Sequence, residues 1–479
     1  MRLLDRLHRH AAAAPEAIVY RDSATSQTWT YRQLLFRSAT LAHRLASQCT
    51  AESVVLICCP NSMEFAVAFL GTLAAGCAAF PVSIENPPAE LHDVARRANA
   101  ACIIAPDDVL SALPETPGIP LAELKDESRE TFPSLAPAGI SARLLLVSSG
   151  STGKPKIACR SGDAVDAVAE QIAIAIGLLD CDRILGLVPM CHAYGIEHEL
   201  LAPIWVGAAV HLCQGLDLSL IRRELENSNI TMLPGVPSIF EMLGQLGEQA
   251  RQGATLRAAY SAGGPLPSSV SQTFTSRFGV RVGQLYGASE FGSITFGDPA
   301  DPNYPASSVG RPMPGVTIRI VPGTDPNVCQ PTGDEGQVWV AARSMFNGYL
   351  GESDPSLIDG FFPTGDLGRL DSQGHLTITG RIKLMIDIGG QKVNPLEVED
   401  VLLQHPGVAD CVVIAVRQSP TVLRLKAVVT SKAGPLDIEE LRRFAQQHLA
   451  GYKVPRVFEV CRSLPRNATG KIQRHLVQA

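Results

Sequence analysis

A loop of hydroxyl, glycine and lysine residues follows a short apolar run in the first third of the chain. The run, residues 143–147, has the pattern of a buried strand, and the loop reads Ser148-Ser149-Gly150-Ser151-Thr152-Gly153-Lys154-Pro155-Lys156. Glycine lets several backbone N–H groups converge on an anion and lysine adds positive charge, so this composition suits the phosphates of ATP. Taken alone, the segment could also be a Ser/Gly-rich surface loop, which is the less favoured interpretation.

The spacing of the glycines argues against the commoner phosphate loop. A Walker A sequence has four residues between its glycines and continues with Lys-Ser or Lys-Thr. Here Gly150 and Gly153 are only three positions apart, and Lys154 precedes Pro155. A P-loop fold is therefore not expected.

Five further segments carry residue types that fit a single reaction. They are, in chain order, Pro189–Gly195 with its His192, Tyr286-Gly287-Ala288-Ser289-Glu290, Thr364-Gly365-Asp366, Gly380-Arg381-Ile382-Lys383, and Pro465–Arg474 with its Gly470-Lys471. Together with the loop, and in this order, they resemble the motifs of the adenylate-forming enzymes. That superfamily comprises acyl- and aryl-CoA synthetases, adenylation domains of peptide synthetases and firefly-type luciferases. The resemblance extends from the Thr30-Tyr31 region to the C-terminus and is greatest to an aryl or acyl acid ligase.

The resemblance implies a ligase reaction in two steps. A carboxylate attacks the α-phosphate of ATP, giving acyl-AMP and pyrophosphate, and the acyl group then passes to a thiol. Two anions must meet in the first step, so catalysis depends on neutralising charge and on alignment. The implied cofactors are ATP, Mg²⁺ and the thiol of coenzyme A or of phosphopantetheine.

The resemblance also assigns the nucleotide-binding residues. The phosphates would be held by Ser148, Ser149, Gly150, Ser151, Thr152, Gly153 and Lys156, and the rest of the nucleotide by Gly263, Gly264, Tyr286, Gly287, Asp366 and Arg381. Tyr286 would stack on adenine, and Asp366 would accept hydrogen bonds from the ribose hydroxyls. Taken singly, Tyr286 could be a core aromatic and Asp366 a turn residue.

Four residues are assigned to the chemistry and its control. Ser289, which replaces the commoner Thr, would offer its hydroxyl to the α-phosphate, and Glu290 would hold Mg²⁺. Lys471 would contact both the carboxylate and the α-phosphate, although an isolated lysine in such a loop is ordinarily solvated. Lys383 lies where the family places the hinge between its two domains.

The acid would be bound by small and apolar residues. The implied lining is His192, Ala193, Gly195, Val236, Pro237, Ala262 and Gly263. Amino-acid-activating relatives have an Asp at the position of Ala193 to bind the substrate ammonium, and a buried ammonium without a counter-charge is costly. We therefore expect an aryl acid such as a hydroxybenzoate, or an acyl chain, and not an α-amino acid. His192 is either a gate beside the carboxylate or a packed histidine.

Length and patterning predict an α/β protein of more than one domain. The chain has 479 residues, 46% of them apolar. This length exceeds what a single hydrophobic core usually accommodates. Residues 52–286 alternate short apolar runs with helical periods, which predicts parallel sheets flanked by helices, and short alternating strands after Gly310 predict a small β subdomain. We expect an N-terminal adenylation core, 1–383, and a small mobile α+β domain, 384–479, that carries Lys471.

Charge and targeting signals bear on partners and location. Residues 384–479 carry a net charge of +4 and residues 1–383 carry −10, with eight basic residues and one acid between Arg442 and Arg474. This basic tail suits an anionic partner, either coenzyme A or an acidic acyl carrier protein, or else is a solvated face. The sequence has no signal peptide or transmembrane run, so we expect a cytoplasmic protein with no nucleic-acid partner.

Three other functions compete with a CoA ligase. An AMP ligase would load an acyl carrier protein in a biosynthetic pathway, and a non-catalytic protein would bind the nucleotide only. A phosphotransferase using the glycine-rich loop would release ADP, whereas a ligase releases pyrophosphate and AMP.

Overall fold

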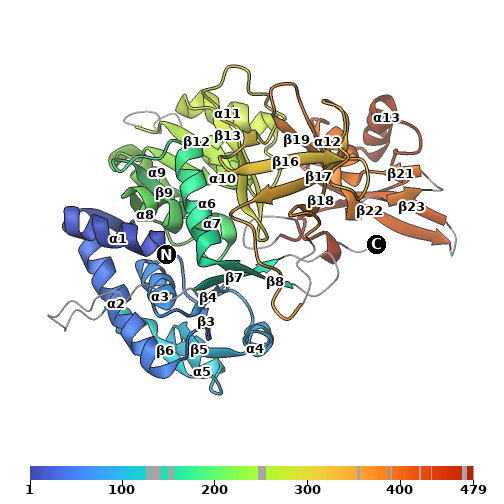
Figure 1. Cartoon of the computed structure of the whole chain (residues 1–479). Coiled ribbons are helices and arrows are strands. Elements are labelled where there is room, and N and C mark those ends of the chain that lie inside the picture. The colour runs from blue at the N-terminus through green and yellow to red at the C-terminus, as the bar shows by residue number, and fades with distance from the viewer. Residues whose placement is uncertain are drawn as a thin grey trace. The chain divides into compact units, whose positions relative to one another are not determined.

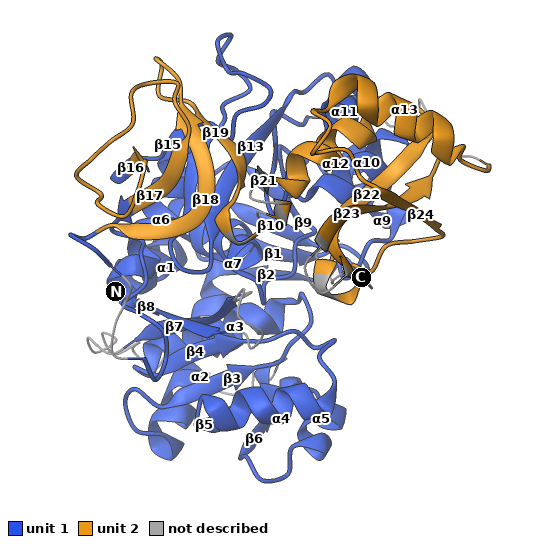
Figure 2. Cartoon of the chain, turned by 90° about the vertical axis from the view of Figure 1, so that its right-hand side faces the viewer, with its two compact units in different colours: residues 1–317, 341–360 blue, residues 318–340, 361–479 orange. Residues whose placement is uncertain are grey.

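The chain forms two compact units (Figure 2). In this computed structural model the first unit contains residues 1–317 and 341–360, and the second contains 318–340 and 361–479. The residues described are 1–125, 142–148, 156–245, 255–352, 357–384, 386–388, 391–419, 422–432, 434–466 and 472–477. The expected functional division at Lys383 stays a prediction.

A nine-stranded sheet runs through the first unit. Six of its strands are parallel, and the antiparallel strands β2, β14 and β15 lie at its two edges. Its order is β15 (Arg311–Pro312), β14 (Gly292–Phe296), β13 (Val282–Ala288), β12 (Ala258–Ser261), β11 (Met232–Gly235), β9 (Arg183–Gly186), β10 (Ala209–Leu212), β1 (Ile18–Asp22) and β2 (Thr28–Thr30).

A six-stranded sheet forms the other layer of the first unit. Its order is β6 (Gly118–Pro120), β5 (Ala100–Ala105), β3 (Val54–Ile57), β4 (Ala78–Pro81), β7 (Arg143–Ser148) and β8 (Lys156–Ser161). Five strands are parallel, and β8 returns antiparallel to β7 with Ser148 opposite Lys156.

Helices cover both faces of these sheets, as Figure 1 shows by label. They are α1 (Arg2–Ala13), α2 (Tyr31–Gln48), α3 (Met63–Ala74), α4 (Pro88–Arg97), α5 (Asp107–Ala112), η1 (Leu121–Lys125), α6 (Gly162–Ala175), α7 (Ala193–Ile196), the π-helical turn η2 (Glu197–Leu201), α8 (Ala202–Val206), α9 (Leu218–Asn227), α10 (Pro237–Gly244) and α11 (Ser268–Phe278). A capping box between Thr30 and Gln33 starts α2. All twelve residues of α3 are buried, which explains its lack of a polar face.

The described residues of the first unit form three apolar clusters that stabilise it. The largest joins side chains of both sheets to α1, α2, α3, α6 and α8. The second packs α9, α10 and α11 on the nine-stranded sheet, and the third packs α4 on the six-stranded sheet. Helices on both faces of mostly parallel sheets define the α/β class, so the predicted fold class is confirmed.

Among its described residues, the second unit is built from three small sheets and two α-helices, and one of these sheets contains a parallel pair of strands. Its first sheet has the order β16 (Val316–Val321), β17 (Gly336–Ala342), β18 (Phe362–Leu370) and β19 (Leu376–Arg381). After η4 (Ile382–Leu384) come β20 (Ile386–Ile388), β21 (Gln391–Val393), α12 (Pro395–Leu403), β22 (Val408–Ser419), β23 (Val422–Ser431), α13 (Ile438–His448), β24 (Val457–Cys461) and η5 (Arg474–Leu476). The expected β subdomain and α+β tail are both present.

Strand β8 separates the predicted phosphate loop from helix α6, and β9 ends at Gly186, before the Pro189–Gly195 segment. Within the described parts of the chain, no helix is long and apolar enough to cross a membrane.

Candidate active site

The predicted site residues of the first unit lie after the carboxyl ends of four neighbouring parallel strands. In α/β sheets, ligands bind outside these ends. His192, Ala193 and Gly195 follow β9, Val236 and Pro237 follow β11, Ala262, Gly263 and Gly264 follow β12, and β13 ends in Tyr286, Gly287 and Ala288 before Ser289 and Glu290. The sheet therefore brings segments separated by up to a hundred residues to one edge.

The six-stranded sheet reaches the same place through β7. Ser148 is the buried last residue of β7, and the Ser289 hydroxyl donates a hydrogen bond to the carbonyl of Val147 at 3.1 Å. Ser148 and Lys156 thus flank the predicted phosphate loop beside Ser289. Ser149, Gly150, Ser151, Thr152 and Gly153 lie outside the described residues.

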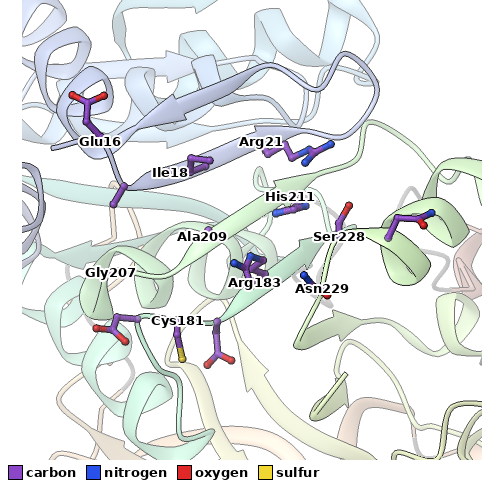
Figure 3. Close-up of a pocket in the computed structure, with 14 residues that line it drawn as sticks. Glu16, Ile18, Arg21, Cys181, Arg183, Gly207, Ala209, His211, Ser228 and Asn229 are labelled. Carbon is purple, nitrogen blue, oxygen red and sulfur yellow. The ribbon is translucent and has the colours of Figure 1, made fainter. Parts of the chain in front are cut away.

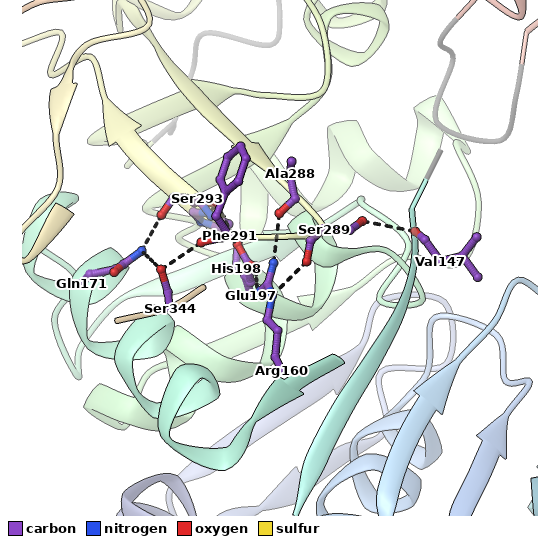
Figure 4. A network of polar contacts seen from close by, with 10 residues as sticks. All are labelled: Val147, Arg160, Gln171, Glu197, His198, Ala288, Ser289, Phe291, Ser293 and Ser344. Carbon is purple, nitrogen blue, oxygen red and sulfur yellow. Dashed lines mark hydrogen bonds and ion pairs between the residues drawn. The ribbon is translucent and has the colours of Figure 1, made fainter. Parts of the chain in front are cut away.

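A buried arginine holds the backbone of the Tyr286–Glu290 segment (Figure 4). Arg160, on β8, is fully buried and donates from Nε to the carbonyl of Ser289 and from Nη2 to that of Ala288, both at 3.0 Å. Its Nη1 lies 2.6 Å from Oε1 of Glu197, which is 1% exposed. Neither Arg160 nor Glu197 was predicted from the sequence. The available signal was Arg160, a charged residue inside a strand.

The second carboxylate oxygen of Glu197 extends this network to β14. Oε2 of Glu197 accepts hydrogen bonds from the backbone N–H and the hydroxyl of Ser293, at 3.0 and 2.8 Å. The ring of His198 contacts the Ser293 hydroxyl at 3.1 Å, and burial lowers the pKa of His198 to about 3. His198 is therefore neutral, and the one positive charge in this network is Arg160. A fully hydrogen-bonded buried pair of this kind fixes geometry at the cost of desolvation.

Two glycines of the site are required by close backbone approaches. A Cβ on Gly287 would lie 2.4 Å from the carbonyl oxygen of Gly292, where β13 meets β14. A Cβ on Gly195 would lie 2.2 Å from the carbonyl oxygen of Pro189. Both positions exclude any larger residue, because the opposing atom is backbone.

The His192 segment is anchored by its neighbour Tyr194. The Tyr194 hydroxyl donates to the carbonyl of Tyr260 and accepts from the N–H of Gly235, each at 3.1 Å, so it joins the ends of β11 and β12. Burial lowers the pKa of His192, and the nearby Glu85 opposes this shift. The ring of His192 is thus favoured in its neutral form, which is compatible with a gate or with a packed side chain.

A second buried carboxylate belongs to Glu199, in the turn η2 that follows α7. Oε1 of Glu199 accepts from the N–H of Val188 at 2.6 Å, and Oε2 accepts from the Asn61 amide at 3.2 Å. Burial nevertheless raises the pKa of Glu199 to about 8. Glu199 is therefore predominantly protonated at neutral pH.

Glu290 has the chemistry of a ligand for a nucleotide-borne cation. Mg²⁺ is usually bound in proteins by one or two carboxylates together with substrate phosphates. Among the described residues, no group of three or more His, Cys, Asp or Glu side chains is arranged to hold a metal by itself. A lone carboxylate such as Glu290 fits a metal that arrives with ATP.

In the second unit, Asp366, which was predicted to bind the ribose, forms an ion pair with Arg381, which was also assigned to the nucleotide. Asp366 on β18 is opposite Arg381 on β19, and Nε of Arg381 donates to Oδ1 of Asp366 at 2.6 Å. Asp366 is 7% exposed, whereas 40% of the Arg381 side chain is exposed. Nη2 of Arg381 also donates to Oδ2 of Asp366, at 3.4 Å, so the guanidinium orients both carboxylate oxygens. Lys383 lies in η4 but its side chain is not described, and Lys471 lies outside the described residues.

One cavity of the first unit lies away from these residues (Figure 3). Its volume is about 610 Å³, and its lining includes Arg21, Asp180, Arg183, Ala209 and His211. Most of this lining belongs to the amino-terminal ends of β1, β9 and β10 or to the turns before them. The cavity therefore lies at the opposite end of the strands from the predicted acid and nucleotide residues.

Comparisons with known proteins cover almost the whole chain. Residues 7–350 match the family model described as AMP-binding enzyme, and residues 397–471 match the AMP-binding enzyme C-terminal domain. The chain is 33% identical to a 2-succinylbenzoate–CoA ligase of Bacillus licheniformis, over 70% of this chain and 69% of that protein. It is 27% identical to a malonate–CoA ligase of Arabidopsis thaliana, over 86% of this chain and 75% of that protein.

One solved structure carries a nucleotide and a metal. It is O-succinylbenzoate coenzyme A synthetase from Bacillus subtilis in complex with ATP and magnesium ion. It superposes with a TM-score of 0.87 at 25% identity and covers 98% of each chain.

Proposed function

Because this chain belongs to the AMP-binding enzyme family and is an AMP-forming acid–thiol ligase, we propose that it activates an aryl or acyl carboxylic acid and transfers it to coenzyme A. The observation that supports this most is the meeting of the Ser148, His192, Gly263 and Tyr286–Glu290 segments at the carboxyl ends of two sheets. A ligase must hold ATP and a carboxylic acid side by side, and these segments carry the predicted nucleotide-binding and acid-binding residues.

In the proposed first step, a carboxylate oxygen of the acid attacks the α-phosphorus of ATP and pyrophosphate leaves. Tyr286 would stack on adenine, the Ser289 hydroxyl would contact the α-phosphate, and Asp366 would accept hydrogen bonds from the ribose. When bound, Mg²⁺ would neutralise phosphate charge, and Glu290 would hold it. Lys471 would neutralise the two anions as they meet, which is the kind of electrostatic stabilisation that dominates such reactions.

In the proposed second step, the thiolate of coenzyme A attacks the acyl carbonyl carbon and AMP leaves. The residues after Lys383 would then present a different face to the first unit. The hinge at Lys383 and the lid role of residues 384–479 are part of this proposal.

The charges near α7 support an acid without an ammonium group. Glu197 is paired with Arg160, and Glu199 is protonated at neutral pH by the effect of burial. Neither carboxylate is therefore free to balance a substrate ammonium beside Ala193. Val236 and Ala262 are apolar and buried, which suits an aromatic ring or an acyl chain. The named relatives act on succinylbenzoate and on malonate, so the family accommodates both an aromatic acid and a short diacid.

Transfer to an acyl carrier protein is the second candidate for the thiol step, and it depends on the basic tail. Among the described basic residues of this tail, four form ion pairs, namely Arg442 with Glu439, Lys453 with Glu397, Arg466 with Asp410 and Arg474 with Glu399. The surface left for an acidic protein is thus smaller than the sequence indicates. This favours coenzyme A, whose few phosphates need fewer cations.

ATP–pyrophosphate exchange over a panel of acids tests the proposal. We expect exchange with at least one aryl or acyl acid and none with free α-amino acids, and the Lys471→Ala variant is the control for contaminating activity. Robust exchange with any α-amino acid would contradict the substrate class, and ADP as the product would contradict the ligase step. Thioester formation from the preferred acid with coenzyme A or with a phosphopantetheinylated carrier protein then separates the two acceptors.

A further inference from the structure

Residues 344–352, here called the 344–352 segment, run along β8. This strand is the element that directly follows the predicted phosphate loop. The N–H of Asn347 donates to the carbonyl of Cys159 at 2.7 Å, and the N–H of Cys159 donates to the carbonyl of Gly348 at 2.9 Å. The N–H of Leu350 donates to the carbonyl of Ile157 at 2.8 Å. The segment is therefore fixed to β8 by backbone hydrogen bonds.

The same segment holds Glu290 by its backbone and by its side chain. The N–H of Phe346 donates to the carbonyl of Glu290 at 2.7 Å, and the Tyr349 hydroxyl donates to Oε1 of Glu290 at 3.0 Å. Oε2 of Glu290 has no hydrogen bond or ion pair within the described part of the chain. The carboxylate is thus oriented through one oxygen and leaves the other available.

The ring of Tyr349 also links Glu290 to the end of the phosphate loop. Nζ of Lys156 lies 4.6 Å from the centre of the Tyr349 ring and 2.9 Å from Oε2 of Glu352. A continuous set of contacts therefore runs from Glu352 through Lys156 and Tyr349 to Glu290. All of these residues belong to the first unit.

Tyr349 is suited to act only as a donor. Its hydroxyl donates to Oε1 of Glu290, and an ionised carboxylate oxygen can only accept a hydrogen bond. A glutamate carboxylate on a flexible side chain samples several orientations unless a partner holds it. Mg²⁺ demands near-ideal octahedral geometry, and the partners that orient a ligand contribute to metal affinity.

We propose that Tyr349 is a positioning residue for metal–nucleotide binding, which holds Glu290 so that its free carboxylate oxygen meets the divalent cation carried by ATP. The inference rests on the proposed role of Glu290 in the ligase. Tyr349 itself does not touch the cation or the nucleotide, and it acts through Glu290.

The alternative is that Tyr349 only packs the segment. Its ring lies 4.9 Å from that of Phe346, and this contact needs no hydroxyl. Tyr349→Phe removes the hydroxyl and retains the ring over Lys156, so the variant should fold. Tyr304→Phe is the control, because the hydroxyl of Tyr304, a residue more buried than Tyr349, also donates a hydrogen bond to an oxygen, the carbonyl of Ser308, at 2.9 Å.

The test measures binding and needs no acid substrate. Free Mn²⁺ is quantified by its EPR signal in titrations of the full-length protein with α,β-methylene ATP, and thermal unfolding is followed in parallel. We expect Tyr349→Phe to weaken Mn²⁺ binding about tenfold, the low end for removal of a group that orients a metal ligand. Binding of the nucleotide analogue without metal should stay within about twofold, and Tyr304→Phe should leave Mn²⁺ binding unchanged.

A double variant separates positioning from packing. Because Tyr349 acts through Glu290, Tyr349→Phe added to Glu290→Gln should produce no further loss of Mn²⁺ affinity. The inference is overturned if Tyr349→Phe leaves Mn²⁺ affinity unchanged, if the two losses add, or if Glu290→Gln has no effect. Failure of every acid in the exchange assay would instead contradict the proposed ligase function and would leave this binding result standing.

Discussion

In the first unit a buried ion pair, Arg160 with Glu197, supports the predicted site, whereas in the described part of the second unit most ion pairs have an exposed partner. Arg160 and Glu197 are 0% and 1% exposed, and their remaining hydrogen-bonding atoms are used on the Ala288, Ser289 and Ser293 backbone. In the second unit, Lys453 and Glu397 are 20% and 46% exposed, and Arg466 and Asp410 are 39% and 34% exposed.

This difference separates two uses of charge. A buried, fully bonded pair cannot be rearranged cheaply, so it fixes the backbone on which Tyr286, Ser289 and Glu290 stand. An exposed charge is hydrated and contributes little to stability. An exposed ion pair can therefore be rearranged cheaply, which fits a unit expected to bring Lys471 to the reaction.

The largest expected effect comes from breaking the buried pair. Arg160→Met should destabilise the first unit by about 3–5 kcal/mol, because it leaves Glu197 without its counter-charge. The matched change in the second unit, Lys453→Met, should cost less than about 1 kcal/mol. Urea unfolding followed by circular dichroism compares the two, and equal shifts of the transition midpoint would remove the distinction between the units.

Lys471 and Lys383 test whether the second unit supplies charge by moving. Lys471→Ala should slow acyl-AMP formation by about 10²-fold or more, the scale of losing one electrostatic stabiliser. It should still form thioester from synthetic acyl-AMP, since two anions no longer have to meet. Lys383→Pro should retain acyl-AMP formation and lose thioester formation. Proline fixes φ, and the φ angle of a hinge residue must change.

Two assays on both variants decide this point. Pyrophosphate release from acid and ATP reports the first step, and thioester formation from synthetic acyl-AMP reports the second. If each substitution depresses both steps by similar factors, alternation of the second unit about Lys383 is wrong.

Asp366 tests whether an already paired carboxylate still serves the nucleotide. Asp366→Ala should weaken ATP binding roughly tenfold, because hydrogen bonds to a charged group contribute about 1.5–3 kcal/mol. Asp371→Ala is the control, since Asp371 follows the same strand and binds His375. Calorimetry measures both dissociation constants, and an unchanged value for Asp366→Ala would contradict the ribose contact.

The smallest expected effect is a pH dependence of stability from Glu199. Its folded pKa of about 8 lies above the unfolded value of 4.5, so its contribution is full below pH 4.5 and is lost as the pH rises through about 8. Between pH 6 and pH 7 the native protein should lose about 1 kcal/mol of stability relative to Glu199→Gln. Urea titrations of both proteins at the two pH values measure this, and parallel behaviour would mean that Glu199 is ionised when folded.

The sequence by itself determined the class of fold and the family. Alternating apolar runs and helical periods are local properties, so they predicted the helix-flanked parallel sheets of residues 52–286 and the short strands after Gly310. The resemblance over six motifs identified the family because each motif is a short contiguous segment. Asp366 and Arg381 are likewise only 15 positions apart and lie on one hairpin.

The tertiary structure alone decided which residues support the site. Arg160 lies 129 positions from Ser289, and Tyr349 lies 59 positions from Glu290. No local pattern signals these contacts, because they depend on the order of strands in two sheets and on the return of residues 344–352 along β8. The sequence can indicate which side chains bear the chemistry, but burial and partners, which set the charge of Glu199 and the fixed position of Glu290, arise only when distant segments pack together.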